Sequence, residues 1–433
     1  MNKKILTLAL PNIISNLSVP LLTSIDTALM GRLESEIYIG AIALGGIIFN
    51  FLYWSFGFLR MGSTGLTAQA FGEHNEAKLM QILGRAVVFG VASGVILLVL
   101  QYPIMNLGLN LLDGSQAVED IARQYVSVRI WAAPATLGLY GLMGWFFGMQ
   151  NAVVPMILTI IINIVNIIAN IICINYFGMK AEGVALGTVI AQYTGFIVAL
   201  VIFYRKHGRL LHYFNKEAIF EVKAFKQFLT LNRDIFIRTF LLVFSFAFFE
   251  NKSAAQGDLT LAINSILLQF IGWISYGIDG FAYASESLVG RFKGAKDSTN
   301  LRKAIRLSFL WAYGLAVLYS LLFYLFDTKL LRLFTNQEQL IAATQPYTVW
   351  IIGFPILATA SYIWDGIYVG LTASKAMRNT MFLSFAFFMM SYYITEYQVE
   401  QMSNFWLWLN FGGFIFIRGF IQTVYYKKYL SIK

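Results

Sequence analysis

Long apolar stretches separated by short polar segments run along the whole chain. Strict alternation of apolar and polar positions, which membrane β-barrels require, is absent from the sequence. We therefore predict an all-α integral membrane protein whose helices each cross the bilayer in about 20 residues. Twelve spans are expected, at residues 5–31, 38–70, 82–111, 121–148, 154–177, 183–204, 232–250, 259–289, 303–326, 343–371, 379–395 and 404–426. The second and eighth are too long for one straight span, so they should bend or extend beyond the bilayer.

One pattern of glycines occurs twice along the chain. Three glycines recur 222 residues later: Gly72 as Gly294, Gly144 as Gly366 and Gly148 as Gly370. Pro134 and Pro355 lie in matching apolar segments, one residue off that register. Duplicated membrane halves are typical of secondary transporters, which bind substrate between the halves near the bilayer midplane.

The longest polar interval, residues 205–231, separates the two halves. We expect an N-lobe at residues 1–204 and a C-lobe at residues 232–433, each with six spans. Apolar residues of the interval are spaced to share one helical face, which favours an amphipathic helix on the inner leaflet; a solvated linker is the alternative. Since each half holds an even number of spans, both enter the membrane from the same side and the repeat is parallel.

Composition and charge agree with a membrane protein and give it an orientation. The chain is 58% hydrophobic and 12% charged, with a net charge of +10. With a cytoplasmic N-terminus, 21 Lys/Arg fall in inside segments and six in outside loops. This bias predicts that both termini are cytoplasmic, in a cell (inner) membrane. The basic clusters therefore indicate topology and contact with anionic lipid, and no nucleic-acid partner is expected.

Cysteine and histidine usage argues against a bound metal or other cofactor. Cys173 is the only cysteine, so neither a disulfide nor a thiolate cluster is expected within the chain. His74, His207 and His212 all fall in segments predicted to be cytoplasmic, so no metal site is expected in the membrane.

Ionisable residues inside a membrane are costly, so each one in a predicted span is a functional candidate. The candidates of the first half are Asp26 and Arg60, and those of the second are Arg238, Asp279, Glu286 and Asp365. The last four and Arg60 could equally form structural ion pairs. The glycine pairs are better explained by close helix packing than by ligand binding.

Asp26 is the strongest candidate. Desolvation disfavours its charged form, so it could exchange a proton near neutral pH. Asn163, Asn166 and Asn170 recur at three and four residues, which places them on one face of a predicted helix. With Thr188, these residues could form an oxygen-rich site for a proton or a small cation, or a hydrogen-bond network without a transport role.

Several segments resemble one known family. The matching segments are PNIISNLSVPLLTSIDTALMGRL from Pro11, FGFLRMGSTGLTAQAFG from Phe56, LNRDIFIRT from Leu231, YGIDGFAYASESLVG from Tyr276, WDGIYVGLTASKAMRN from Trp364 and IRGF around Arg418. Together they resemble the DinF-like branch of the multidrug and toxic compound extrusion (MATE) family, and they extend over nearly the whole chain.

The resemblance implies two six-helix lobes around a V-shaped cavity, and export of organic, often cationic, compounds against inward H⁺ or Na⁺. It assigns the first-helix aspartate to Asp26, its neighbours to Asn166, Asn170 and Thr188, and the proline that bends the first helix to Pro11. The family commonly has a second aspartate where this chain has Asn170. A single carboxylate is compatible with H⁺ coupling, which we favour, or with Na⁺.

Three functions therefore compete: an ion-coupled exporter of small organic compounds, a lipid-linked oligosaccharide flippase of the same superfamily, and a membrane enzyme. A flippase should present more basic residues to a pyrophosphate than the mainly acidic candidates here. HExxH, GxSxG and P-loop motifs are absent from the sequence, which disfavours an enzyme. We expect a monomeric exporter whose partners are its substrate and the bilayer.

Overall fold

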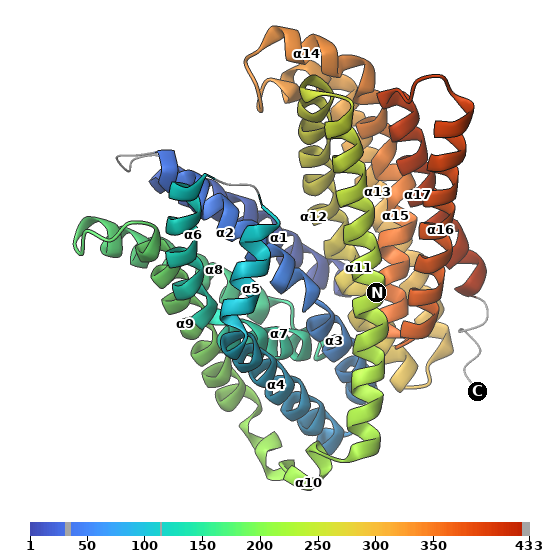
Figure 1. The fold of residues 1–433 in the computed structure, drawn as a ribbon. Helices are drawn as coiled ribbons and strands as arrows, with labels where there is room; N and C mark the ends of the chain where they lie inside the picture. Colours follow the sequence, from blue (N-terminus) through green and yellow to red (C-terminus); the bar gives the residue numbers. More distant parts are fainter. Residues whose placement is uncertain (31–35, 113–114, 427–433) are drawn as a thin grey trace. The chain divides into compact units, whose positions relative to one another are not determined.

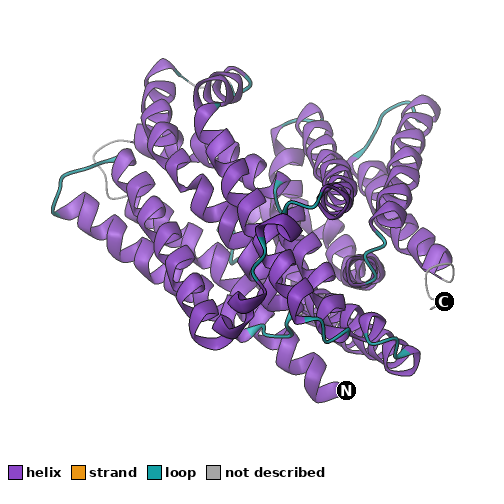
Figure 2. Cartoon of the chain, turned by 90° about the horizontal axis from the view of Figure 1, so that it is seen from below, coloured by secondary structure: helices purple, strands orange, loops and turns teal. Residues whose placement is uncertain are grey.

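The computed structural model describes residues 1–30, 36–112 and 115–426, without the side chains of residues 19–30 and 36. Every regular element in those ranges is a helix, as predicted (Figure 2). The chain divides into two compact units: the N-unit, residues 14–229, and the C-unit, residues 1–13 and 230–433. Two helices, α1 (Asn2–Met30) and α11 (Val222–Ala255), contribute residues to both.

Figure 1 labels the helices in chain order. Those of the N-unit after α1 are α2 (Glu36–Ser55), α3 (Phe58–Gly72), α4 (Glu76–Val99), α5 (Gln101–Asn110), α6 (Gln116–Arg129), α7 (Ala133–Gly148), α8 (Val153–Asn175), α9 (Ala181–His207) and α10 (Lys216–Ile219), with 3₁₀ turns η1 (Ile130–Ala132) and η2 (Gly208–Tyr213). Those of the C-unit after α11 are α12 (Asp258–Gly294), α13 (Ser298–Leu331), α14 (Glu338–Thr344), α15 (Thr348–Gly370), α16 (Ser374–Gln398) and α17 (Asn404–Tyr425), with 3₁₀ turn η3 (Gln345–Tyr347).

Nine helical stretches in the described ranges are long and apolar enough to cross a membrane, by length and composition. They coincide with nine of the twelve predicted spans. The other three predictions, 5–31, 232–250 and 379–395, fall on α1, α11 and α16, which are helices but do not belong to those nine. The all-α membrane fold is confirmed, and the count of twelve stays a prediction.

The two unusually long predicted spans behave differently. The first is broken, because α2 ends at Ser55 and α3 begins at Phe58. Phe56 and Gly57 form the turn between them, with amides that donate to the carbonyls of Tyr53 and Trp54 at 3.1 and 3.0 Å. The second is a single helix, α12, whose 37 residues exceed the thickness of a bilayer core at about 1.5 Å per residue.

The predicted repeat is visible in the backbone of the two units. All four non-glycine residues with positive φ in the described ranges form two pairs 222 residues apart. His74 and Lys296 have a φ of 55°, while Gln150 and Thr372 have 59° and 50°. L-residues rarely adopt this left-handed conformation. Each half therefore closes equivalent helices with the same turns.

The repeated glycines make equivalent contacts as well. Gly144 of α7 lies against the backbone carbonyl of Arg60 in α3, and Gly366 of α15 lies against that of Ala282 in α12. The second glycine of each pair repeats this: a Cβ at Gly148 would be 2.8 Å from the carbonyl of Thr64, and one at Gly370 would be 2.5 Å from that of Glu286. These distances leave no room for a side chain, so both glycine pairs permit backbone-to-backbone helix packing.

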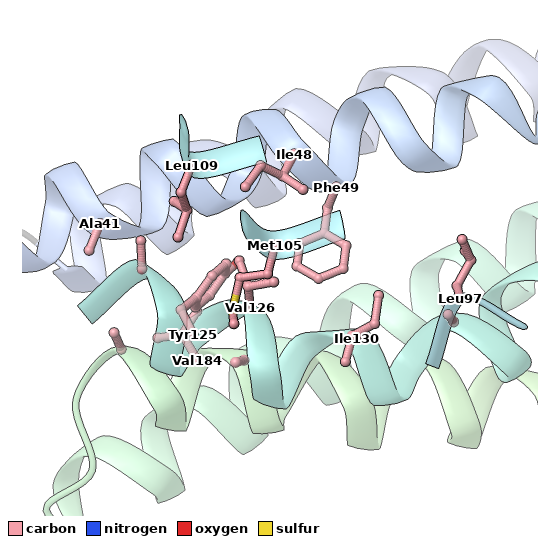
Figure 3. Packing of buried hydrophobic residues seen from close by; sticks show 14 of the residues in the cluster. Ala41, Ile48, Phe49, Leu97, Met105, Leu109, Tyr125, Val126, Ile130 and Val184 are labelled. Carbon is pink, nitrogen blue, oxygen red and sulfur yellow. The ribbon is translucent and has the colours of Figure 1, made fainter. Parts of the chain in front are cut away.

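A hydrophobic core in the N-unit is built from α2, α5, α6 and α9, with residues of α4, η1 and α7 (Figure 3). Phe49 of α2 packs against Tyr125 of α6, with ring centroids 6.5 Å apart and nearly perpendicular. The guanidinium carbon of Arg129 lies 4.7 Å from the Phe49 ring centroid. An arginine is thereby accommodated in this apolar region through contact with aromatic faces.

The interval between the halves does not form the single amphipathic helix that its pattern favours. Residues 205–231 contain the end of α9, η2, α10 and the beginning of α11. Ile219 of this interval is 2% exposed and lies against Gly84 of α4, whereas Phe220 and Leu229 are 56% and 37% exposed. Arg85 of α4 donates to the carbonyls of Ile219 and Ala218 at 2.9 and 2.6 Å. Contact with α4 therefore determines the path of this segment.

Candidate functional site

The predicted asparagine stripe on α8 forms a hydrogen-bonded chain with α9. Asn170 Nδ2 donates to Asn166 Oδ1 at 3.1 Å, and Asn166 Nδ2 donates to Thr188 Oγ1 at 3.1 Å. The Thr188 hydroxyl in turn donates to the carbonyl of Val184 at 3.0 Å. Asn166 and Asn170 are 3% and 0% exposed. Three of the predicted site residues are thus brought together in one buried polar chain.

Asn163, the third asparagine of the stripe, contacts α1 instead. Its Nδ2 lies 3.1 Å from Ser18 Oγ. One turn earlier on both helices, Ser15 Oγ donates to Thr159 Oγ1 at 3.0 Å. These two contacts join α1 to α8 at successive turns. Residue numbers increase in the same direction on both helices, so this part of α1 runs parallel to α8.

Asp26 belongs to α1, but its side chain lies outside the described residues. The helix α1 is assigned without interruption across Pro11, so a bend at that proline stays a prediction. The boundary between the C-unit and the N-unit nevertheless falls just after it, between Ile13 and Ile14.

A cluster of charged side chains lies inside the C-unit around Asp365 of α15. Arg238 of α11 and Arg418 of α17 both form ion pairs with its Oδ2. Gln422 of α17 donates to its Oδ1 at 2.8 Å. Asp365 is 5% exposed, and the two arginines are 7% and 1% exposed. One carboxylate therefore joins three helices, in a low-dielectric setting where unpaired charge would be costly.

Two further acidic candidates lie on α12. Asp279 interacts electrostatically with both Arg238 and Arg418, so it belongs to the same charge cluster. Glu286 is 1% exposed, and its backbone carbonyl is the one that Gly370 approaches. The cluster thus combines two acidic groups, on α12 and α15, with two basic groups, on α11 and α17. The numbers of acidic and basic groups are equal.

Arg60 of α3 belongs to the N-unit. Its guanidinium carbon is 5.6 Å from the ring centroid of Phe147 on α7. Its backbone carbonyl is the one that Gly144 contacts. Arg60 therefore lies at the packing interface of α3 and α7.

The family model for MatE matches residues 11–172 and 235–394, which cover most of both halves. The chain belongs to the MatE family. Its multi-pass helical fold is the one expected of MATE transporters.

Known proteins similar to this MatE chain include bacterial and animal members. The chain is 33% identical over 429 residues to DNA damage-inducible protein F of Escherichia coli, covering 99% of this chain and 92% of that protein. It is 27% identical over 349 residues to Multidrug and toxin extrusion protein 1 of Pongo abelii, covering 78% of this chain and 59% of that protein. A crystal structure of the Vibrio cholerae MATE transporter VcmN in the bent form is similar in fold, with a TM-score of 0.86 and 20% identity over 99% of this chain and 97% of that one.

Sequence reasoning missed two members of the Asp365 cluster in this MatE protein. Arg418 is an ionisable residue inside a predicted span, so the criterion that selected Arg238 should also have selected it. Gln422 follows four residues later and therefore shares its helical face, a signal that becomes useful once Arg418 is considered.

Proposed function

We propose that this MatE protein exports organic compounds, cationic or amphiphilic in character, by alternating access in exchange for H⁺. Export is supported by membership of a family in which a 27% identical relative is named for multidrug and toxin extrusion. The duplicated halves are in turn typical of secondary transporters, which use an ion gradient and no cofactor.

The register of α1 along α8 is the observation that carries the coupling proposal. Ser15 contacts Thr159 and Ser18 contacts Asn163, so positions on α8 exceed those on α1 by about 144. Continued for two more turns, this register brings position 26 level with Asn170. The helical period also places position 26 on the face of α1 that Ser15 occupies. This register supports Asp26 as the carboxylate that acts with the polar chain of α8 and α9.

The chemistry of that chain favours H⁺ over Na⁺. Asn166, Asn170 and Thr188 are neutral and already hydrogen-bonded to one another. Asp26 is the only carboxylate within the predicted spans of the first half. Desolvation disfavours the charged form of a carboxylate that has only neutral neighbours, which is compatible with proton exchange. Sodium coupling is the alternative, with one carboxylate and several neutral oxygens as ligands.

The charge cluster of the C-unit bears on the choice of cargo. A flippase for pyrophosphate-linked oligosaccharides needs arginines that are available to phosphate. Arg238 and Arg418 are both engaged by Asp365 instead. We therefore favour organic cations over anionic lipid carriers as cargo.

Efflux from proteoliposomes tests the proposal, with a fluorescent organic cation as cargo and a pH gradient or a Na⁺ gradient imposed in turn. We expect uphill export under the pH gradient alone. Asp26→Asn should insert normally and still mediate downhill exchange, yet fail to export uphill under either gradient.

The exposed Asp258 of α12 offers a matched control, because Asp258→Asn removes an equal charge at an exposed position just before a predicted span. This variant should behave like the unmodified protein. Uphill export under the Na⁺ gradient but not under the pH gradient would show that Na⁺, and not H⁺, is the coupling ion. Full uphill export by Asp26→Asn would place coupling elsewhere, with Asp279, Glu286 and Asp365 of the C-unit as the remaining acidic candidates.

A further inference from the structure

Three aromatic rings form a corner where α11 and α16 end in the C-unit. The rings of Phe248 and Tyr392 have centroids 5.0 Å apart and planes at 88°. The Tyr393 ring lies 5.4 Å from that of Tyr392, at 87°. The three rings thus present walls in different directions, as in the aromatic cages that bind ammonium groups.

A cation of the chain itself occupies this corner. Lys252 Nζ lies 5.6 Å from the centroid of Phe248 and 5.2 Å from that of Tyr392. It also lies 3.8 Å from Glu396 Oε1. The Tyr392 hydroxyl donates to the same carboxylate oxygen at 3.1 Å and so holds it beside the rings.

The corner is exposed on one side, where Tyr393 is 54% exposed, whereas Tyr392 is 2% exposed. The corner is also favourable to positive charge. The side chains of Lys252 and Glu396 are 27% and 42% exposed. Lys252 lies in the last turn of α11, and Glu396 lies near the end of α16. Helix C-termini carry partial negative charge, so the helix ends and the carboxylate both attract a cation.

We propose that Phe248, Tyr392, Tyr393 and Glu396, here called the ammonium cage, form a binding site for organic ammonium ions, with Lys252 as a tethered occupant that such ions displace. Cation–π attraction and the Glu396 carboxylate select the charge, while the open side accommodates the organic substituents. As a site for cargo, the cage rests on the proposed export of cations. Its ability to bind ammonium ions does not depend on transport.

Because an ammonium ion must displace Lys252, the proposal predicts the direction in which substitution of this lysine changes the affinity. A tethered lysine competes at a high effective concentration, so the unmodified protein should bind an external ammonium ion weakly. Replacement of Lys252 by a neutral side chain should strengthen binding of the external ammonium ion, even though the ion pair between Lys252 and Glu396 is lost. Loss of a merely structural ion pair would produce no such gain.

Isothermal titration calorimetry with benzyltrimethylammonium, on purified full-length protein, measures this. Lys252→Met should bind the probe about tenfold or more tightly than the unmodified protein. Addition of Glu396→Gln to that variant should weaken binding again. Neopentylbenzene, a neutral analogue of similar shape, should not gain affinity for Lys252→Met.

Lys329 provides the matched control. Its Nζ lies 5.7 Å from the ring of Phe326, and among the described residues this is its one cation–π contact, so Lys329→Met should leave probe affinity unchanged. Lys252→Gln replaces Lys252→Met if the latter loses its thermal transition. Unchanged affinity in folded Lys252 variants, or an equal gain for the neutral analogue, would refute the cage. Failure of export alongside the predicted binding pattern would refute only the proposed function.

Discussion

At the scale of single residues, Asp365 shows how much a charge inside a membrane protein depends on its partners. Its position in a predicted span is compatible with a functional carboxylate or a structural ion pair. In the structure it forms ion pairs with Arg238 and Arg418 and accepts a hydrogen bond from Gln422. These partners come from helices distant in sequence. Local patterns identify which residues are expensive to bury, and only tertiary packing decides which of them neutralise one another.

Removal of the Asp365 charge should therefore destabilise the protein strongly. Asp365→Asn leaves two buried guanidinium groups without their shared anion, at a cost of about 3–5 kcal/mol. We expect an earlier thermal transition in detergent, measured by intrinsic fluorescence. Arg332→Gln is the control, because it breaks an exposed pair with Glu338 and should cost less than about 1 kcal/mol. Equal melting of Asp365→Asn and the unmodified protein would exclude a structural role.

Asp297 offers a residue-scale test outside the membrane spans. It precedes α13 and accepts hydrogen bonds from the backbone and the side chain of Asn300, at 3.0 and 2.7 Å. These bonds lower the pKa of the Asp297 carboxyl below its ordinary value. A carboxyl whose pKa is lowered by folding stabilises the folded state at pH values above its ordinary pKa. This stabilisation is lost as the pH falls through the pKa of the folded state.

Asp297→Asn should remove this dependence on pH. The difference in melting temperature between the variant and the unmodified protein should be constant above about pH 5 and shrink as the solution becomes more acidic. The equivalent residue of the other half, Asn75, caps α4 without a charge by accepting from the amide of Lys78 at 2.9 Å. Asn75→Ser, which keeps a capping oxygen, should therefore show no such trend.

At the scale of elements, glycine spacing predicted both the repeat and the close packing of its helices. The 222-residue register reappears in the left-handed residues and in the carbonyls that the glycines contact. The course of residues 205–231 was not predictable in this way. A pattern of apolar positions indicates which residues seek burial, but the surface that receives Ile219 is supplied by α4, more than 130 residues earlier in the chain.

The two glycine pairs should respond alike to substitution. Gly144→Ala and Gly366→Ala each place a methyl group against a backbone carbonyl, which cannot move away as a side chain can, so each should destabilise by about 1–3 kcal/mol. Thermal shift of the purified variants measures this. Gly314 of α13 has no neighbour at its Cβ position, so Gly314→Ala should change stability by at most about 1 kcal/mol. Unequal effects of Gly144→Ala and Gly366→Ala would show that the halves pack differently.

At the scale of the whole molecule, hydropathy predicted the fold class, which is confirmed, and twelve spans, a number that stays a prediction. The helix α11 holds Arg233, Asp234 and Arg238 near the beginning of its predicted span, which lowers its resemblance to an ordinary membrane helix. Such charges are tolerated because partners such as Asp365 are present in the fold. The sidedness of the molecule rests on the distribution of lysine and arginine alone.

Sidedness is open to direct measurement. Accessibility reporters fused within residues 205–226 should appear cytoplasmic, because six basic residues are concentrated there. Reporters near Lys180 or Lys329 should appear external. The opposite pattern at both kinds of site would overturn the predicted orientation, and reporters near Lys180 and Lys329 on different sides would contradict the parallel repeat.

Equivalent backbone contacts in the two halves carry unlike side chains, and this has an evolutionary consequence. Arg60 corresponds to Ala282, and Thr64 corresponds to Glu286, although the facing glycines are the same. After a gene duplication, selection on helix packing would maintain the shared scaffold in both copies. The side chains of one copy would then be free to acquire a new task while the other retained the ancestral one. Divergence between the halves could therefore proceed without altering the architecture that holds them.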